Sequence, residues 1–556
     1  MAALGAALGA CAPPRAAAPD GGDQAPAPSG PAITMCPAAG HAPPSSGTCT
    51  VTAGGAALLI TGTILTPGQV LRGGQVLVDA GGKLACVACD CSAMAPGATA
   101  LDCPRGVVSP GLINTHDHIT YTQNAPAADT GERYEQRNDW RKGLRGHSQI
   151  AASGGASTQQ VQWGEARFVM GGATSTVGSG GAVGLLRNLD VEIEEQGLGH
   201  RAVDFNTFPL GDSSGMQLAS GCGYPFADTA QSIAADKSFE PHIAEGVDAV
   251  AHNEFLCASS SANGGQLLMQ QQSAFIHAAG LAAQDWRAMS GARSKLIWSP
   301  RSNLRLYGNT AQVTVAGRLG VTIALGTDWT PSGSMNLLRE LACADSYNQT
   351  YLDRFFTDEE LWLMVTRNAA IVTATDDAIG ILQPGLYADL AIFDGSRRAD
   401  HRAILGAEPQ DVTLVLRAGK PLYGDTALVS ALGGAACDAI AVCGADKSLC
   451  AKTETGSTYA TLAAASGGYA AFFCGTPDGE PTCVPSRPSS INGSTIYSGV
   501  PTATDSDGDG IPDAMDDCPK VFNPIRPVDD GKQPDSDGDG LGDACDPCPF
   551  EAGSSC

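Results

Sequence analysis

Short runs of apolar residues, separated by polar and glycine-rich segments, recur along the chain. The run at 106–113 leads directly into Asn114-Thr115-His116-Asp117-His118. A continuous apolar run of this kind is typical of a strand covered on both faces, as in a parallel sheet. Because alternate residues of a strand point to the same side, His116 and His118 share a face. The pattern predicts either a pair of metal ligands or two polar residues that merely end the strand.

Strand and helix patterns alternate between residues 107 and 379. The expected strands are 107–115, 174–178, 201–207, 239–242, 273–277, 295–299 and 321–326, and the expected helices include 164–169, 311–319 and 359–370. This alternation predicts an α/β fold with a parallel sheet, and a length of about 250 residues suits a (β/α)8 TIM barrel. The patterns give seven strands rather than eight. We expect the eighth between 207 and 239, where glycine, serine and aspartate obscure it.

Two β-rich segments flank the predicted barrel. Residues 51–106 contain apolar runs broken by glycine, and a similar pattern returns at 380–425. Such runs predict strands and turns. Since the segments lie on either side of one α/β region, we expect both flanks to form a single small β-sandwich domain. Residues 426–500 carry few charges and five cysteines, and they predict a disulfide-braced extension.

The first eleven residues are small and apolar and end in Leu8-Gly9-Ala10-Cys11, which resembles the end of a bacterial lipoprotein signal. The positively charged start of such a signal is absent, so the start codon lies upstream or the match is accidental; we favour the first. Residues 12–50, rich in alanine, proline and glycine, predict a disordered tether. No apolar run reaches the roughly 18 residues of a membrane-spanning helix. Membrane contact is therefore expected only through a lipid anchor on Cys11.

Cysteine content and charge limit the location and the partners. Nineteen cysteines suit an oxidising compartment, so we expect an exported protein of the bacterial envelope or one that is extracellular. Cys86-x-x-Cys89-x-Cys91 could instead be a zinc or redox motif, although no second pair follows at zinc-ribbon spacing. A formal net charge of -25 and a pI of about 4.6 argue against nucleic acid and anionic membrane surfaces as partners.

Ionisable residues follow three further apolar runs. His242 ends 239–242 and Glu245 follows it, His277 ends 273–277, and Asp328 follows 321–326. Singly, each has an ordinary structural explanation, such as a helix cap, a first-turn carboxylate or a core histidine. In a (β/α)8 barrel, however, the carboxyl ends of all strands meet at one mouth, where catalysis takes place.

The order of these motifs resembles the amidohydrolase superfamily, specifically its aminohydrolase and chlorohydrolase branch, which includes guanine, cytosine and triazine deaminases. The similarity covers roughly residues 55–425 and is specific as a joint pattern. The matching segments are Pro110 to His118, His242-Ile243-Ala244-Glu245, His277, Ser299 to Leu304, Ala324 to Asp328 and Gly380 to Leu390.

The resemblance implies that His116, His118, His242 and Asp328 bind one divalent transition metal, zinc or iron. It implies catalytic roles for Glu245 and His277, and for Asp328 as the group that takes a proton from water. Two-metal members add a carboxylated lysine on the fourth strand. Lys142 and Lys237, the only lysines between His118 and His242, do not lie at such a position, so one metal is the better interpretation.

A metal-activated water would then attack a trigonal carbon of a small-molecule substrate. The His-x-x-Glu pattern favours deamination, or cleavage of another C–N or a C–halogen bond, in a nitrogen-containing ring; peptide bonds are not expected. The alternative enzyme hydrolyses a cyclic amide or an imidazolone-type ring. An alternative of another class is a calcium-dependent surface adhesion protein with an inactive barrel. In the loop at 132–141, Arg133 or Arg137 could bind an acidic group of the substrate, or the loop could be a solvated helix start. The remaining histidines match no ligand position and are expected to be structural: His147, His200, His252 and His401.

Residues 501–556 repeat an acidic pattern after thirty residues and hold fourteen acidic residues against three basic ones. Carboxylates at positions 1, 3, 5, 9 and 12 around a glycine at 6 suit a Ca²⁺ cage. The pattern resembles the thrombospondin type 3 repeat, and a plain disordered acidic tail is the alternative. The candidate calcium ligands are Asp505, Asp507, Asp509, Asp513, Asp516, Asp535, Asp537, Asp539, Asp543 and Asp546.

Overall fold

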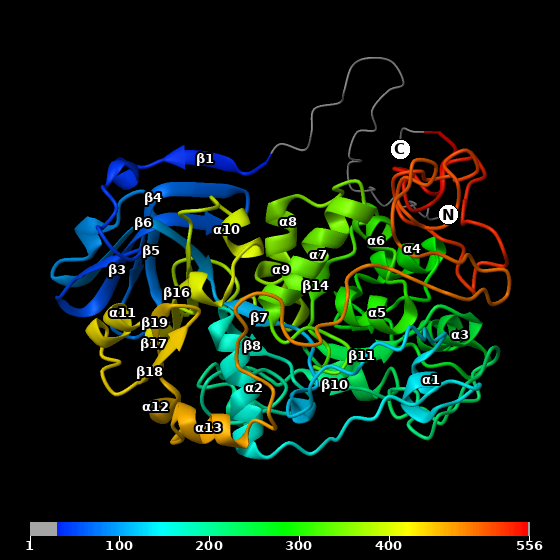
Figure 1. Ribbon diagram of the computed structural model, residues 1–556, viewed down its shortest axis with the longest axis horizontal. Helices are drawn as coiled ribbons and strands as arrows, with labels where there is room; N and C mark the ends of the chain where they lie inside the picture. The colour runs from blue at the N-terminus through cyan, green and yellow to red at the C-terminus, as the bar shows by residue number, and fades with distance from the viewer. Residues whose placement is uncertain (1–29, 554–556) are drawn as a thin grey trace, which may run out of the picture.

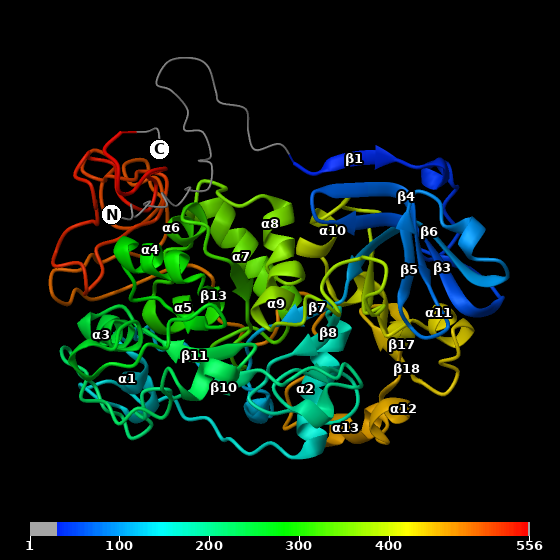
Figure 2. The same cartoon turned by 180° about the vertical axis from the view of Figure 1, so that it is seen from behind.

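The computed structural model describes residues 30–553. Figures 1 and 2 show a β-sheet at one end of the molecule and a helix-rich body in the middle. The C-terminal segment covers the far end, beside α4 and α6. The predicted signal 1–11, with Cys11, and the tether up to residue 29 lie outside the described residues.

The β-sheet at one end contains eleven strands drawn from both flanks of the body. β6 from the N-terminal flank pairs antiparallel with β15 from the C-terminal flank, with Val108 opposite Ile392. Hydrogen bonds link all eleven strands into one sheet that draws on both flanks. Its arrangement as a two-layered sandwich stays a prediction. The strands are β1 (Ala32–Met35), β2 (Thr50–Thr52), β3 (Gly55–Thr66), β4 (Gln69–Val78), β5 (Leu84–Ala88), β6 (Ala98–Pro110), β15 (Leu390–Asp394), β16 (Val412–Arg417), β17 (Lys420–Asp425), β18 (Asp438–Val442) and β19 (Ala445–Leu449).

Residues 30–50, which the composition predicted to be part of a disordered tether, are held against this sheet by disulfides. β1 pairs with β4, and the Cys36–Cys89 and Cys49–Cys103 bonds hold its neighbourhood, so the predicted tether at 12–50 does not extend over residues 30–50. The prediction failed because the alanine and proline content hid two cysteine anchors. Cys86 bonds to Cys91 and Cys89 bonds to Cys36, so none of the three thiols is free to bind zinc. In the extension, β18 and β19 continue the same sheet.

Eight short parallel strands form the centre of the body. They fall into two sheets, β7-β8-β9 and β10-β11-β12-β13-β14. Backbone hydrogen bonds from Val203 to Leu189 (2.8 Å) and from Thr115 to Leu325 (3.3 Å) connect the margins of these sheets. No strand pairing in residues 30–553 joins the two sheets into a closed barrel. The strands are β7 (Leu112–Asn114), β8 (Ala173–Thr176), β9 (Arg187–Asn188), β10 (Asp204–Asn206), β11 (Phe239–Ile243), β12 (Ala274–His277), β13 (Lys295–Trp298) and β14 (Ile323–Leu325).

The strand that the sequence pattern could not place is β9, before β10 and not between 207 and 239. It comprises only two residues, Arg187 and Asn188, and both are polar, so no apolar run announces it. The segment 207–239 contains a 3-10 turn, Ser232–Ala235, in place of the predicted strand.

Most helices lie around the central strands, while α11 packs on β17 and β19 of the large sheet (Figure 1). A capping box of Ser157 and Gln160 starts α2, satisfying backbone donors that the helix leaves open. The pattern at 359–370 is two helices, α8 and α9, instead of one. No helix in the described part of the chain is both long and apolar enough to span a bilayer. The helices are α1 (Arg137–Lys142), α2 (Thr158–Met170), α3 (Ala249–Ala258), α4 (Ala283–Ala292), α5 (Pro300–Tyr307), α6 (Val313–Arg318), α7 (Leu337–Tyr351), α8 (Asp358–Leu363), α9 (Arg367–Val372), α10 (Arg402–Leu405), α11 (Thr426–Ala431), α12 (Ala451–Thr455) and α13 (Tyr459–Ala465).

The irregular C-terminal segment is bonded to the central body along its length. The Cys343–Cys483 disulfide joins it to α7. Further along, the buried Arg526 guanidinium donates to the backbone oxygens of Ala279 (3.1 Å) and Leu281 (2.8 Å). These oxygens lie just after β12, so the tail packs directly against a loop at the strand ends.

A buried ion pair fixes the β-sheet end against the central strands. Arg187 of β9 donates to both carboxylate oxygens of Asp389, at 2.7 and 3.0 Å. Both side chains are almost fully buried. The geometry is therefore that of a bidentate pair in which neither charge reaches water.

We predict that Asp389→Asn lowers the free energy of unfolding by about 3 kcal/mol, because it leaves the Arg187 cation buried without its partner. Urea unfolding followed by circular dichroism measures this change. Asp446→Asn, on the exposed side of β19, removes the same charge and should change the free energy by less than about 0.5 kcal/mol. Equal, small effects of both substitutions would contradict the assignment.

Candidate metal centre and substrate pocket

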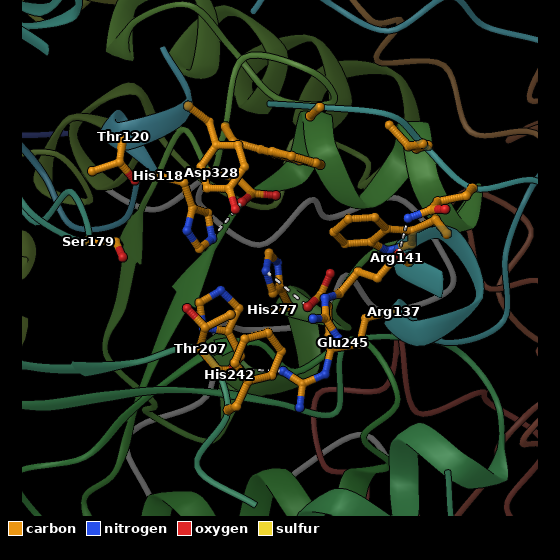
Figure 3. Close-up of a pocket in the computed structure, with 17 residues that line it drawn as sticks. His118, Thr120, Arg137, Arg141, Ser179, Thr207, His242, Glu245, His277 and Asp328 are labelled. Atoms are coloured by element: carbon orange, nitrogen blue, oxygen red, sulfur yellow. Dashed lines mark hydrogen bonds and ion pairs between the residues drawn. The ribbon is translucent and has the colours of Figure 1, made fainter. Parts of the chain in front are cut away.

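A pocket of about 460 Å³ opens where the central strands end. His118, His242, Glu245, His277 and Asp328 are part of its lining (Figure 3). Each comes from a different strand end or the turn after it: His118 follows β7, His242 lies in β11 with Glu245 just after it, His277 ends β12, and Asp328 follows β14. His116, also after β7, is completely buried behind this surface.

The structure brings all six predicted residues together. Asp328 Oδ1 lies 3.2 Å from His116 Nε2 and 3.6 Å from His118 Nε2. The rings of His116 and His242 are 4.8 Å apart between centroids, and those of His242 and His277 are 5.3 Å apart. His277 Nε2 lies 3.8 Å from Glu245 Oε2.

Strained and close-packed backbone places these side chains. Ala244, His277 and Asp328 adopt left-handed φ angles of 55°, 70° and 63°, which cost free energy for residues other than glycine and occur most often at functional sites. Gly326, two residues before Asp328, passes so near to β7 that an added Cβ would lie 2.5 Å from the His116 Cβ. The Gly-Thr-Asp sequence therefore serves the close approach of Asp328 to His116.

Burial keeps the histidines neutral. It lowers the pKa of His116 and of His277 to about 3, and that of His118 to about 4, because the charged imidazolium loses its hydration. The pKa of His242 is likewise lowered by burial and by the neighbouring imidazoles. Neutral imidazole is the form that binds a metal.

Two polar nitrogens in this cluster have no hydrogen-bond partner, His116 Nδ1 and His242 Nε2, although both are buried. Such atoms are rare in folded proteins unless a ligand or ion engages them. His116, His118 and Asp328 place their ligand atoms within 4.8 Å of one another, as do His116, His242 and His277. The residues therefore fit a single divalent metal with mixed imidazole and carboxylate ligands.

Glu245 has a different environment from Asp328. Tyr307 donates a hydrogen bond of 2.7 Å to its Oε1, and Trp140 Nε1 donates to the Tyr307 hydroxyl at 2.8 Å. Burial raises the pKa of the Glu245 carboxyl to about 8. Asp328, by contrast, receives a hydrogen bond of 2.5 Å from the Ser302 hydroxyl on Oδ2. The two carboxyl groups thus have different hydrogen-bond donors within one pocket.

Several residues around the site escaped the sequence interpretation. Tyr307 and Ser302 lie on α5, and Asn303 of the same helix contacts His277 Nδ1 at 3.0 Å. The matched segment Ser299 to Leu304 marked this helix, but no pattern assigned a role to its side chains. Trp140 and Arg141 of α1 also line the pocket.

In the loop at 132–141, Arg133 and Arg137 are not free to bind an acidic group of the substrate. The loop is not a solvated helix start either. Arg133 is buried and pairs with Asp129 at 3.0 Å. Arg137 is completely buried and pairs with Asp212 at 2.7 Å. Both guanidinium groups therefore already have an acidic partner, which sequence alone did not reveal.

The histidines expected to be structural lie outside the metal cluster. His147 sits between Glu132 and Glu135, His252 contacts Asp285 at 2.9 Å, His200 contacts Asp377 at 3.3 Å, and the His401 ring packs on Trp362.

The acidic tail gathers carboxylates into two clusters. Asp505, Asp507 and Asp509 form one cluster, and Asp535, Asp537 and Asp539 form the other, thirty residues later. Burial and neighbouring carboxylates raise the pKa of Asp507 to about 7 and that of Asp509 to about 8. One buried oxygen of each of these two residues has no hydrogen-bond partner. Repulsion and orphaned oxygens of this kind are what a bound cation would relieve.

Comparison with known proteins shows what parts of the chain resemble. The chain has the fold of a triazine hydrolase variant, with a TM-score of 0.50 at 20% identity over 66% of this chain and 94% of that one. An amidohydrolase family model matches residues 229–422, and a thrombospondin type 3 repeat model matches residues 503–526. These matches confirm both resemblances drawn from the sequence motifs.

Two of the relatives that match in sequence are deaminases. A 5-methylthioadenosine/S-adenosylhomocysteine deaminase of Teredinibacter turnerae is 30% identical over 122 residues, which are 21% of this chain and 28% of the relative. A guanine deaminase of Escherichia coli is 26% identical over 121 residues, 22% of this chain and 27% of the relative. The matches thus span less than a third of either relative.

We predict that Gly326→Ala lowers the free energy of unfolding by about 1–3 kcal/mol, because the new methyl group collides with His116 and forces β7 and β14 apart. Thermal unfolding measures the effect. Gly291→Ala is the matched control, since no atom lies within 4 Å of the added methyl group and the position is exposed near the end of α4. That variant should be as stable as the parent or slightly more stable. A neutral Gly326→Ala would refute the close-approach explanation.

Proposed function

We propose that the protein is a metal-dependent hydrolase that deaminates a nitrogen-containing ring, or cleaves another C–N or a C–halogen bond of such a ring. The observation that carries this proposal is the convergence of three imidazoles, Asp328, Glu245 and His277 on one pocket. We further propose that the eight parallel strands form a (β/α)8 barrel. The candidate site residues lie at or just after the carboxyl ends of those strands, where the active sites of such barrels lie.

His116, His118, His242 and Asp328 would hold one zinc or iron ion. When bound, such an ion lowers the pKa of a coordinated water toward neutrality and so supplies a nucleophile. Neither Lys142 nor Lys237 is part of the pocket lining. Since no lysine is placed to bridge a second metal, we propose that the site holds a single metal ion.

The protein's own groups divide the proton transfers. Asp328 Oδ1 faces the imidazoles and is placed to accept a proton from the attacking water, while the Ser302 hydroxyl orients the other oxygen. Glu245, with a pKa raised to about 8, holds a proton at neutral pH and can donate it to a ring nitrogen or to the leaving group. Asn303 fixes the His277 ring so that Nε2 points toward Glu245 and the reacting centre.

Two other functions remain as alternatives. A cyclic amide or imidazolone-type ring hydrolase would use the same groups on a different carbon, and product analysis distinguishes it by the absence of ammonia or halide. An adhesion protein with an inactive barrel would need no transition metal. The buried, partnerless nitrogens of His116 and His242 favour a metal site, and so favour the enzyme.

We also propose that the acidic tail binds calcium outside the cell. The tail's carboxylate clusters, with orphaned oxygens on Asp507 and Asp509, support this binding. Export to an oxidising compartment is supported by the eight disulfides within residues 30–553. A lipid anchor on Cys11 stays part of the same proposal.

We predict that Glu245→Gln lowers kcat/KM by about 10²–10⁴-fold, because the amide cannot deliver a proton, while the transition-metal content stays at one ion per chain. Ammonia and halide release is measured over a panel of purines, pyrimidines, triazines and cyclic amides with zinc- and iron-reconstituted protein. Mass spectrometry of the metals gives the stoichiometry.

Glu192→Gln removes an exposed carboxylate that is not part of the pocket lining, and it should leave kcat/KM and the transition-metal content unchanged. An unaltered rate in Glu245→Gln would remove this residue from the mechanism. A purified chain that holds calcium but no zinc or iron, and hydrolyses no ring, would favour the adhesion protein.

We predict that Asp509→Asn weakens calcium binding at least about tenfold, because it removes a charged ligand from the first cluster. Isothermal titration of the full chain with calcium measures this change, and chelation should lower the melting temperature of the parent more than that of the variant. Asp530→Asn, an exposed position between the clusters, is the control. Identical calcium affinities for both variants would exclude the first cluster as the site.

A further inference from the structure

Arg141 is a cation of the pocket lining for which the described residues provide no acidic partner. Its guanidinium donates to Asn138 Oδ1 at 2.5 Å and, weakly, to the Ser213 backbone oxygen at 3.5 Å. Neither acceptor carries a charge, and no carboxylate oxygen of residues 30–553 lies within 4.0 Å of it. Burial and the nearby Arg137 guanidinium lower the pKa of Arg141, and the more distant carboxylates of Glu245 and Asp212 offset this only in part.

Arg137, one turn earlier on α1, shows the contrast. Its guanidinium pairs with Asp212 at 2.7 Å and lies 3.9 Å from Glu254. Its charge is therefore neutralised within the protein. Arg141 forms no such pair, since both of its hydrogen-bond acceptors are uncharged, so it is the arginine of this pocket that can take a counter-ion from a ligand.

The surroundings of Arg141 orient it for this role. Its guanidinium stacks over the Phe208 ring at 4.2 Å from the centroid, which fixes its plane. Figure 3 shows Arg141 across the pocket from His118 and Ser179. A substrate that reaches from the metal ligands to Arg141 must therefore extend across the pocket.

An aromatic wall connects these two ends. The Trp140 and Trp329 rings are 5.2 Å apart, and Trp329 lies 6.5 Å from the His118 ring. A planar ring stacked on this wall would place one edge near the metal ligands. A substituent on its opposite edge would point toward Arg141.

We propose that Arg141 is a specificity-determining residue, and that the substrate is a nitrogen-containing ring that carries a carboxylate or phosphate group. A guanidinium offers two parallel N–H donors that match the oxygens of either anion. Pairing with such an anion offsets the desolvation of the Arg141 charge in the pocket. This inference rests on the proposed function for the ring chemistry, but the anion site itself is a separate claim.

The test is a comparison of matched acid and neutral probes by isothermal titration with the zinc-loaded full chain. Pyridine-3-carboxylate is compared with pyridine-3-carboxamide, and phenyl phosphate with phenol. We expect at least one acid to bind about 10–100-fold more tightly than its neutral partner, as for a hydrogen-bonded charge pair. The arm with the larger ratio identifies the carboxylate or the phosphate.

Arg141→Gln should reduce this ratio to within about twofold, and Arg141→Lys, which keeps the charge but loses the fork, should give an intermediate ratio. Lys142→Gln removes the same charge from the next, exposed position of α1 and should preserve the full ratio. Melting temperatures of the variants confirm that each is folded. If Arg141→Gln does not fold, the Arg141→Lys ratio decides.

The inference is overturned if no acid binds the parent more tightly than its neutral partner, or if the variants at Arg141 keep the parent ratio. The proposed function fails separately. Glu245-dependent hydrolysis of neutral rings without any anion preference would refute the Arg141 subsite alone. An Arg141-dependent preference in a chain that hydrolyses no ring would refute the hydrolase and leave the anion site intact.

Discussion

The structure depends on burying a cluster of ionisable groups where water cannot stabilise their charges. Each member must be neutral, paired or engaged by a ligand, because an isolated buried charge costs several kcal/mol. The imidazoles of His116 and His277 meet this constraint by remaining neutral, and Glu245 by remaining protonated. Asp328 meets it through two imidazoles and the Ser302 hydroxyl. His116 Nδ1 and His242 Nε2 still lack a partner, and a ligand or cation in the cluster could engage such atoms.

The need for a partner at every buried charge also applies to the chain beyond residue 425. Arg487, almost completely buried, donates to the backbone oxygens of Tyr134 (3.1 Å) and Tyr307 (2.9 Å) and to Glu135 Oε1 (2.6 Å). Tyr307 in turn donates to Glu245. A single residue, Tyr307, therefore connects the C-terminal extension with the proposed catalytic Glu245. Arg526 likewise supplies donors to the loop after His277. A segment with little regular structure thus contributes to the rigidity of the pocket wall.

Much of the site was predictable from sequence because its residues follow apolar strands. His116, His118, His242, His277 and Asp328 all occupy strand ends that periodicity marks, and their order carries the family resemblance. The two-residue strand β9 was not predictable, because it contains no apolar side chain. The ordered segment at 30–50 was not predictable either, since its order comes from disulfides to distant cysteines rather than from local pattern.

The roles of charged side chains were the least predictable feature, because they depend on partners far away in the chain. Arg133, Arg137 and Arg141 lie within nine residues and look equivalent in the sequence. Asp129 is close in sequence to Arg133, but the acidic partner of Arg137 is 75 residues away. Only the folded chain shows that two of these cations are neutralised internally and that the third is not. A charged side chain that has no counter-ion in a desolvated pocket is therefore a better guide to the ligand than the amino-acid composition of the loop that contains this side chain.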